Sequence, residues 1–109
     1  MTAYLGDLEQ LILLALLRLG PEAYGVAIAE ALAERAGRET SLGAVYKTLT
    51  RLEQKGYVRA TMGEPTPERG GRRKRFYQLT PPGRKMLAAS LAAIRRLSAG
   101  LGNLATEES

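Results

Sequence analysis

Hydrophobic residues recur with the period of an α-helix in the first part of the chain. The first such segment predicts a helix from about Leu8 to Leu19, with Asp7 as its N-cap and Gln10 completing a capping-box-like pair. The pair Gly20-Pro21 should end it. The middle of this helix, LILLALL, is apolar on every side, whereas a surface helix of a monomer has a polar face. We therefore expect one side to pack in the core and the other to contact a second subunit.

Two amphipathic helices follow, one from Ala23 or Tyr24 to about Ala36 and one from after Ser41 to about Lys55, with Gly56 as its stop. The connection between them, GRET, has helix-turn-helix length. The last of these helices shows a stripe that we expect to be buried, formed by Leu42, Val45, Tyr46, Leu49 and Leu52. Its opposite face has polar and basic residues: Lys47, Thr48, Thr50, Arg51, Gln54 and Lys55.

After Gly56 the hydrophobic pattern changes from helix-like to strand-like. Residues 57–62 and 75–79 predict two antiparallel strands joined by a long basic loop. Thr80 then caps a last helix, and apolar residues recur along it at helical spacing. Residues 103–109 are expected to be a disordered tail. The predicted fold class is mainly α with a small β-hairpin, namely a winged helix-turn-helix at 1–80 followed by a dimerisation helix at 81–102.

The charge of the chain is concentrated in its middle. The formal net charge is +5 over 109 residues. Residues 41–85 contain eleven basic and three acidic side chains, whereas residues 1–40 contain three basic and six acidic ones. A basic field confined to one segment is typical of a protein that binds a polyanion. A solvated basic surface without a partner is the alternative for a charge run alone.

Composition argues against an enzyme and against a metal site. The chain has no cysteine and no histidine, so the commonest general base and the commonest zinc ligands are missing. The only aspartate, Asp7, is interpreted as a helix cap, and no glycine-rich phosphate loop is present. We expect no catalytic residue, no cofactor and no metal. The longest apolar run has seven residues and no signal peptide is evident, so we also expect a soluble, cytoplasmic protein without membrane contact.

The predicted order of elements is that of a winged helix-turn-helix. In this motif the start of the second helix of the pair touches base edges in the major groove. Small residues there, Ser41, Gly43 and Ala44, allow close approach, and Lys47 is long and basic. The loop adds Arg69, Arg72, Arg73, Lys74 and Arg75, which suit phosphates and narrow minor grooves. Both features favour double-stranded DNA as the partner.

Four stretches of the chain resemble the PadR family of transcriptional regulators: LGDLEQLILLALLRLG, AYGVAIAEALAER, SLGAVYKTLTRLEQKGYV and GGRRKRFYQLTPPGRKML. Together they span roughly residues 5–100, and the last two are the most specific. The resemblance implies a winged-helix domain and a C-terminal helix that packs against the first helix of the other subunit. It also implies that helix 42–55 is the recognition helix. Tyr46 matches a family tyrosine, Lys47 stands where the family often has proline, and Gly25 of the Tyr24-Gly25 pair is expected to allow close packing.

These considerations predict two sets of site residues. The residues expected to contact DNA are Ser41, Gly43, Ala44, Tyr46, Lys47, Thr50, Arg51, Arg72, Arg73 and Lys74. The residues expected at the interface between subunits are Leu8, Leu11, Ile12, Leu87, Leu91, Ile94 and Leu101.

The predicted function is sequence-specific binding of double-stranded DNA by a homodimeric transcriptional regulator, a repressor acting at a near-palindromic operator. Two alternatives on the same winged fold stay open. One is a protein-interaction module that has lost DNA binding, and the other is a non-specific binder of nucleic acid, RNA included. A small-molecule effector is also left open. The chain has no tryptophan, so a drug pocket walled by tryptophan does not carry over to it.

Overall fold

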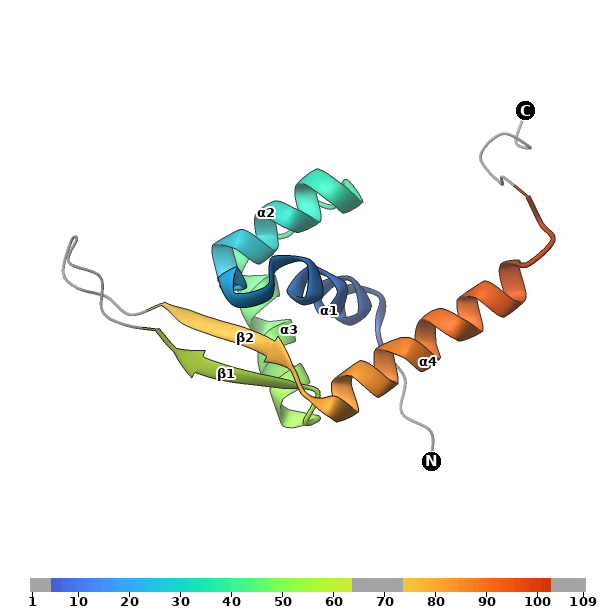
Figure 1. Ribbon diagram of the computed structural model, residues 1–109. Coiled ribbons are helices and arrows are strands. Elements are labelled where there is room, and N and C mark those ends of the chain that lie inside the picture. Colours follow the sequence, from blue (N-terminus) through green and yellow to red (C-terminus); the bar gives the residue numbers. More distant parts are fainter. Residues whose placement is uncertain (1–4, 64–73, 103–109) are drawn as a thin grey trace.

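The computed structural model describes residues 5–63 and 74–102 of the chain. Its elements follow the order helix, helix, helix, hairpin, helix (Figure 1). They are α1 (Asp7–Leu19), the 3-10 turn η1 (Gly20–Glu22), α2 (Gly25–Ala36), α3 (Leu42–Gln54), β1 (Val58–Met62), β2 (Arg75–Leu79) and α4 (Pro81–Ser98). The predicted fold class, mainly helical with one small hairpin, is therefore confirmed. The predicted tail, 103–109, and most of the basic loop lie outside the described residues.

Helix α1 lies at the centre of the fold and packs against α2, α3, β2 and α4. Its buried side is formed by Ile12, Leu13, Ala15 and Leu16. The remaining core residues come from every other element except the 3-10 turn: Ala23, Ile28, Leu32, Val45, Leu49, Leu52, Val58, Tyr77, Leu79 and Leu87. A domain of this size depends on such a shared core, because it buries only a modest fraction of its surface.

The start of α1 differs from the prediction by one residue. Gly6, in an extended conformation, is the N-cap, and the carboxylate of Glu9 accepts a hydrogen bond from the Gly6 N–H at 2.7 Å. Asp7 is the first helical residue and forms an ion pair with Arg38, whereas Gln10 accepts a hydrogen bond from the Ser90 hydroxyl. The predicted capping pair of Asp7 and Gln10 is therefore wrong, because Glu9 folds back over the first turn in their place.

The hairpin is antiparallel, with Val58 opposite Leu79 and Met62 opposite Arg75. A third backbone segment joins it just before α2. The Tyr77 N–H donates to the Ala23 carbonyl at 2.9 Å, and an isolated bridge pairs Tyr24 with Phe76. The sequence pattern did not predict this isolated bridge, which connects the hairpin directly to the helix-turn-helix.

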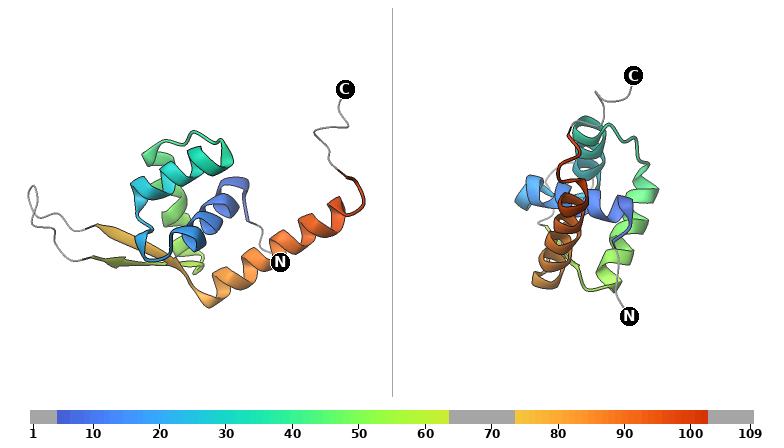
Figure 2. Two further views of the ribbon diagram at one scale, coloured as in Figure 1. Left: turned by 45° about the horizontal axis from the view of Figure 1, so that its top comes forward. Right: turned by 90° about the vertical axis from the view of Figure 1, so that its right-hand side faces the viewer.

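Helix α4 begins at the base of the hairpin and runs away from the body of the fold, in the direction opposite to that in which β1 and β2 extend from it (Figures 1 and 2). Its N-cap is Thr80, as predicted, and the hydroxyl accepts from the Gly83 N–H at 3.1 Å and donates to the Gly56 carbonyl at 2.6 Å. Gly83 is essential to this junction, because a Cβ there would lie 2.1 Å from the carbonyl oxygen of Tyr57. The direction of α4 is therefore determined by its first turn.

Candidate nucleic-acid interface

The first turn of α3 presents small side chains to solvent. Ser41 caps the helix, and its Oγ accepts a hydrogen bond from the Ala44 N–H at 3.1 Å. Gly43 is exposed beside it, and Ala44 is half-buried. Lys47, Thr50 and Arg51 follow on the exposed face at helical spacing. A small-residue start followed by basic side chains is compatible with entry of this helix into a major groove.

The buried face of α3 is turned relative to the predicted stripe. Tyr46 and Leu42, which were expected in the core, are 42% and 44% exposed. Thr48, expected on the polar face, is buried, and its hydroxyl donates to the Ala44 carbonyl at 2.8 Å. The buried positions are Val45, Thr48, Leu49 and Leu52, which repeat at i, i+3, i+4 and i+7. The correction leaves the tyrosine partly exposed at the edge of the buried face.

Tyr46 lies over the start of α2, where Gly25 is the first helical residue. A Cβ on Gly25 would lie 2.1 Å from the tyrosine hydroxyl oxygen and 2.4 Å from the ring carbon that bears it. The expectation that Gly25 allows close packing is thus confirmed. The two helices of the helix-turn-helix approach each other through this glycine.

The described part of the wing adds three cations, Arg59, Lys74 and Arg75, all exposed. The Lys74 ammonium lies 4.2 Å from the centroid of the Tyr24 ring, which also packs edge-on against Phe76. Arg75 pairs with Glu53 of α3 at 3.2 Å. The loop end of the hairpin is therefore tied both to α2 and to α3, with Lys74 at the edge of the helix-turn-helix. Arg69, Arg72 and Arg73 lie outside the described residues.

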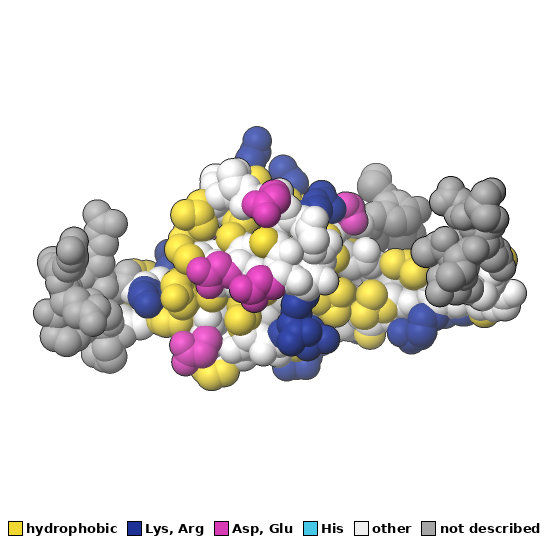
Figure 3. All heavy atoms as spheres, turned by 90° about the horizontal axis from the view of Figure 1, so that it is seen from above, with side chains coloured by type: hydrophobic (Ala, Val, Ile, Leu, Met, Phe, Trp, Pro, Cys, Tyr) yellow, Lys and Arg dark blue, Asp and Glu magenta, His cyan; other side chains and the backbone are white. Residues whose placement is uncertain are grey.

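Sequence reasoning missed Arg59, Tyr24 and Glu53 as parts of this surface. Arg59 faces solvent, as strand alternation after the buried Val58 would have indicated. The partners of Tyr24 and Glu53 come from distant segments, so no local pattern could reveal them. Figure 3 looks onto the α2 side of the molecule, where acidic side chains are interspersed with basic ones. That mixed face contrasts with the exposed part of α3, where Lys47 and Arg51 are both cationic.

The apolar residues expected at a subunit interface fall into two groups. Leu8, Leu11 and Leu91 are half-buried, and Ile94 and Leu101 are about half exposed. Ile12 and Leu87, however, are buried in the core of a single protomer. These two belong to the core cluster that α1 and α4 share with the other elements. Leu97, not predicted, is the most exposed large apolar side chain of the described residues, at 84%.

The described residues contain neither a metal-binding cluster nor a helix able to span a membrane. Across residues 5–63 and 74–102, no three His, Cys, Asp or Glu side chains come together in a way that could hold a metal ion. Over the same ranges, no helix combines the length and the apolar character needed to cross a membrane.

The model of the transcriptional regulator PadR-like family matches residues 13–89. The chain belongs to this family. The match spans the second half of α1, helices α2 and α3, the wing and the first half of α4. PadR-like proteins are transcription regulators rather than enzymes, and the winged-helix fold and the DNA-binding character expected from the sequence follow from membership.

Solved structures agree with this assignment. A PadR family regulator from Clostridium difficile R20291 is 26% identical, with a TM-score of 0.70 over 85% of this chain and 92% of that chain. A PadR-like transcription factor from Bacteroides fragilis is 27% identical, with a TM-score of 0.68 over 86% and 85%. Bacillus subtilis PadR, solved in complex with operator DNA, is 26% identical with a TM-score of 0.65. That alignment covers 78% of this chain and 46% of the other. No curated protein sequence matches the chain.

Proposed function

We propose that this PadR-like chain is a homodimeric repressor that binds a near-palindromic operator in double-stranded DNA. Helix α3 enters the major groove, and the basic wing, residues 63–75, lies on the backbone or in the adjacent minor groove. The observation that supports this most directly is the exposed face of α3, where Lys47 and Arg51 follow a small-residue start. The B. subtilis relative bound to operator DNA adds support from the same family.

Base reading is proposed for the first two turns of α3. Ser41 and Ala44 lie closest to its N-terminus, and Lys47 is one turn further on the exposed face. A lysine there is long enough to donate to guanine O6 and N7. Thr50 and Arg51 lie later on the helix, where a groove-bound helix rises towards the phosphates. We therefore assign discrimination mainly to Lys47, and phosphate contact to Arg51.

Dimerisation is proposed through α1 and the distal half of α4. A groove of about 240 Å³ lies between α1 and α2, and Leu11, Leu14, Leu32, Arg18 and Arg35 are among the residues that line it. Figure 3 also shows hydrophobic side chains along α4 beside the body of the fold. The apolar groove and the exposed apolar side chains of α4 favour a second copy of this chain as the partner that covers them. The two-fold axis would space the recognition helices about 34 Å apart.

Repression follows physically if the dimer covers a promoter, because bound protein excludes the polymerase from the same DNA. No described cavity identifies an effector, and none is proposed.

Selection of binding sites from random duplex DNA, followed by titration against competitor DNA and RNA, tests the proposal. We expect an enriched near-palindrome with half-sites about one helical turn apart, preferred over random duplex by at least about a thousandfold. Equal competition by RNA and random DNA would favour a non-specific binder. Absence of any nucleic-acid affinity would favour a protein-interaction module on the winged fold.

A further inference from the structure

Glu9 is a buried carboxylate at the junction of α1 with α3. Its residue is 4% exposed, and within residues 5–63 and 74–102 it is the only charged residue in the buried class. A charge at such a position is costly unless hydrogen bonds satisfy it. Hydrogen bonds must therefore compensate for the burial of this carboxylate in the first turn of α1.

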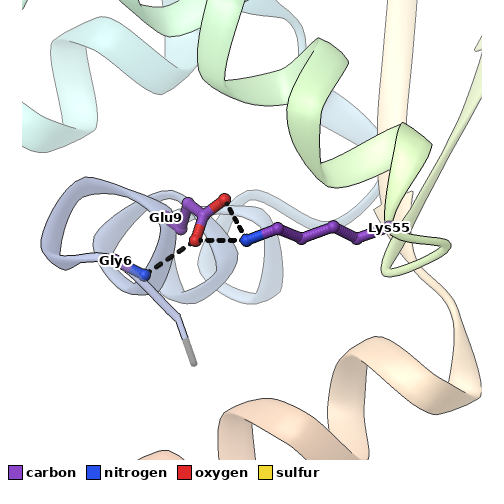
Figure 4. A network of polar contacts seen from close by, with 3 residues as sticks. All are labelled: Gly6, Glu9 and Lys55. Carbon is purple, nitrogen blue, oxygen red and sulfur yellow. Dashed lines mark hydrogen bonds and ion pairs between the residues drawn. The ribbon is translucent and has the colours of Figure 1, made fainter. Parts of the chain in front are cut away.

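Three hydrogen bonds satisfy this carboxylate (Figure 4). The Gly6 N–H donates to Oε1 at 2.7 Å, and the Lys55 ammonium donates to Oε1 at 3.0 Å and to Oε2 at 2.8 Å. Burial raises the pKa of Glu9, but the hydrogen bonds from Lys55 and Gly6 and the charges of Lys55 and Arg51 lower it by more. The group is consequently ionised in the folded protein.

The Lys55 contact joins two distant parts of the chain. Lys55 directly follows the last residue of α3, and Arg51, the proposed phosphate contact, lies one turn earlier. Because the ammonium reaches back to α1, the end of α3 is held against the first turn of α1. The Glu9 end of this ion pair is buried, whereas the Lys55 side chain is 33% exposed. Such a pair contributes little net stability compared with apolar packing, but its buried carboxylate must keep its hydrogen-bond partners. Base reading requires such an arrangement to hold to about 0.5 Å.

We propose that Glu9 is a positioning residue which, through Lys55, sets the orientation of α3 against α1 and thereby the discrimination among DNA sequences. This inference rests on the proposed role of α3 as recognition helix. Glu9 itself touches no DNA. Lys55 is engaged by Glu9, so it is assigned to this contact rather than to a phosphate.

The same turn of α1 offers a matched control. Asp7 pairs with Arg38, and the two side chains are 72% and 41% exposed, so solvent screens this pair. Asp7→Asn and Glu9→Gln remove the same charge from neighbouring positions. Any general effect of net charge on DNA affinity is therefore common to both variants, and only the buried contact differs.

Affinities of the full chain for the selected operator and for random duplex should be measured for wild type and both variants. We expect Glu9→Gln to weaken operator binding about tenfold, because a displaced helix loses part of each base contact. Binding to random duplex should change by less than about twofold, since it depends on phosphate charge. Asp7→Asn should leave the ratio of the two affinities at the wild-type value. An unchanged ratio in Glu9→Gln would overturn the proposal.

A second variant separates positioning from stability. The double change Glu9→Leu with Lys55→Met replaces the pair by apolar groups and should restore or raise thermal stability. We expect its ratio of operator to random affinity to stay reduced. Recovery of the ratio together with stability would reduce Glu9 to a purely structural role. A flatter salt dependence in Lys55→Met would instead place Lys55 on a phosphate, which also contradicts the proposal.

Amide hydrogen exchange tests the contact without DNA. Glu9→Gln should accelerate exchange in the last turn of α3, and Asp7→Asn should not. If the wild-type protein showed no sequence preference, the proposed function would be wrong. The amide exchange rates would still show whether Glu9 keeps the end of α3 in place against α1. Unchanged exchange in Glu9→Gln would refute the positioning role even if the operator is bound as proposed.

Discussion

Helices α1 and α3 are the same length, 13 residues, and both bury one face in the same core. They differ in the face that points outwards. On α1 that face is apolar, with Leu11 and Leu14 half-buried and Leu17 exposed. On α3 it is polar and cationic, with Lys47 and Arg51 exposed. Two helices that share one core thus present opposite chemistry to the outside.

The contrast shows that the outward face of a core helix, rather than its buried face, indicates which kind of partner the helix binds. Exposure of an apolar surface to water is unfavourable, so such a surface favours contact with another protein chain. A cationic surface with small residues at a helix start favours the phosphates and base edges of DNA. Changes confined to one face should therefore alter one activity and spare the other.

The largest effect is expected at the proposed dimer interface, to which α1 and α4 both contribute apolar side chains. Ile94→Glu together with Leu97→Glu places charges on α4 side chains that are exposed in the protomer, so the fold itself should persist. Burial of one aliphatic side chain stabilises an interface by about 1.5–3 kcal/mol, and a two-fold interface contains each side chain twice. Sedimentation at micromolar concentration should show that the double variant is a monomer. The control variant Met62→Glu, on the hairpin, should remain a dimer. A wild-type monomer under these conditions would contradict the dimer proposal.

The next effect concerns the cationic surface. Replacing Arg72, Arg73 and Lys74 by alanine should reduce the slope of log affinity against log salt by up to about 2.7, since each phosphate contact contributes about 0.9. Affinity should fall for all sequences alike. Arg95→Ala with Arg96→Ala removes charge from α4 and serves as the control. If the wing variant keeps the wild-type slope, the wing does not contact the backbone.

A finer effect separates two residues of α3. Lys47→Ala should relax the base preference at one position of each half-site. About 1–3 kcal/mol of discrimination between the preferred base and the others should be lost there. Arg51→Ala should weaken all sites in proportion, because phosphates are the same in every sequence. Binding-site selection with each variant distinguishes these results. A consensus untouched by Lys47→Ala would show that the DNA responds to its charge and not to a base contact.

The contact between α2 and α3 is testable by a double-mutant cycle. Gly25→Ala brings a Cβ against the Tyr46 hydroxyl and ring, and overpacking of this kind typically costs about 1–3 kcal/mol. In a Tyr46→Ala background the same change should cost much less. Denaturant unfolding of the four proteins measures the coupling. Equal costs in both backgrounds would mean that the glycine is needed for another reason.

The smallest effect concerns pH and the first turn of α1. The pKa of Glu9 is lowered below its ordinary value of 4.5 in the folded state, so protonation opposes folding. The contribution is present above pH 4.5 and is lost as the pH falls through the folded pKa. The stability curves of wild type and Glu9→Gln should therefore converge below that value. A difference independent of pH would assign the effect to packing.

The sequence alone predicted the type and order of the helices and strands. Their bounds agree within a residue or two except at the end of the last helix, which was expected at 102 and lies at Ser98. Local chemistry explains this success. Gly20, Gly37 and Gly56 all adopt positive φ where helices end, and Thr80 caps the helix that it was expected to cap. The small, exposed start of α3 at Ser41 also followed from local pattern. These features depend on backbone preferences and hydrogen bonds between near neighbours, which a short stretch of sequence contains.

Only the tertiary structure decided which faces are buried and which charges meet. Glu9 and Lys55 are 46 positions apart, and the bridge of Tyr24 to Phe76 joins α2 to the wing. Ile12 lies in the core although its helix is apolar all round, and Tyr46 is exposed although it borders an apolar stripe. Helical periodicity defines faces only to within part of a turn, and the angle at which other elements pack then determines their burial. The sequence therefore determined the elements and their chemistry, and the packing of α1 against α3 determined where that chemistry is presented.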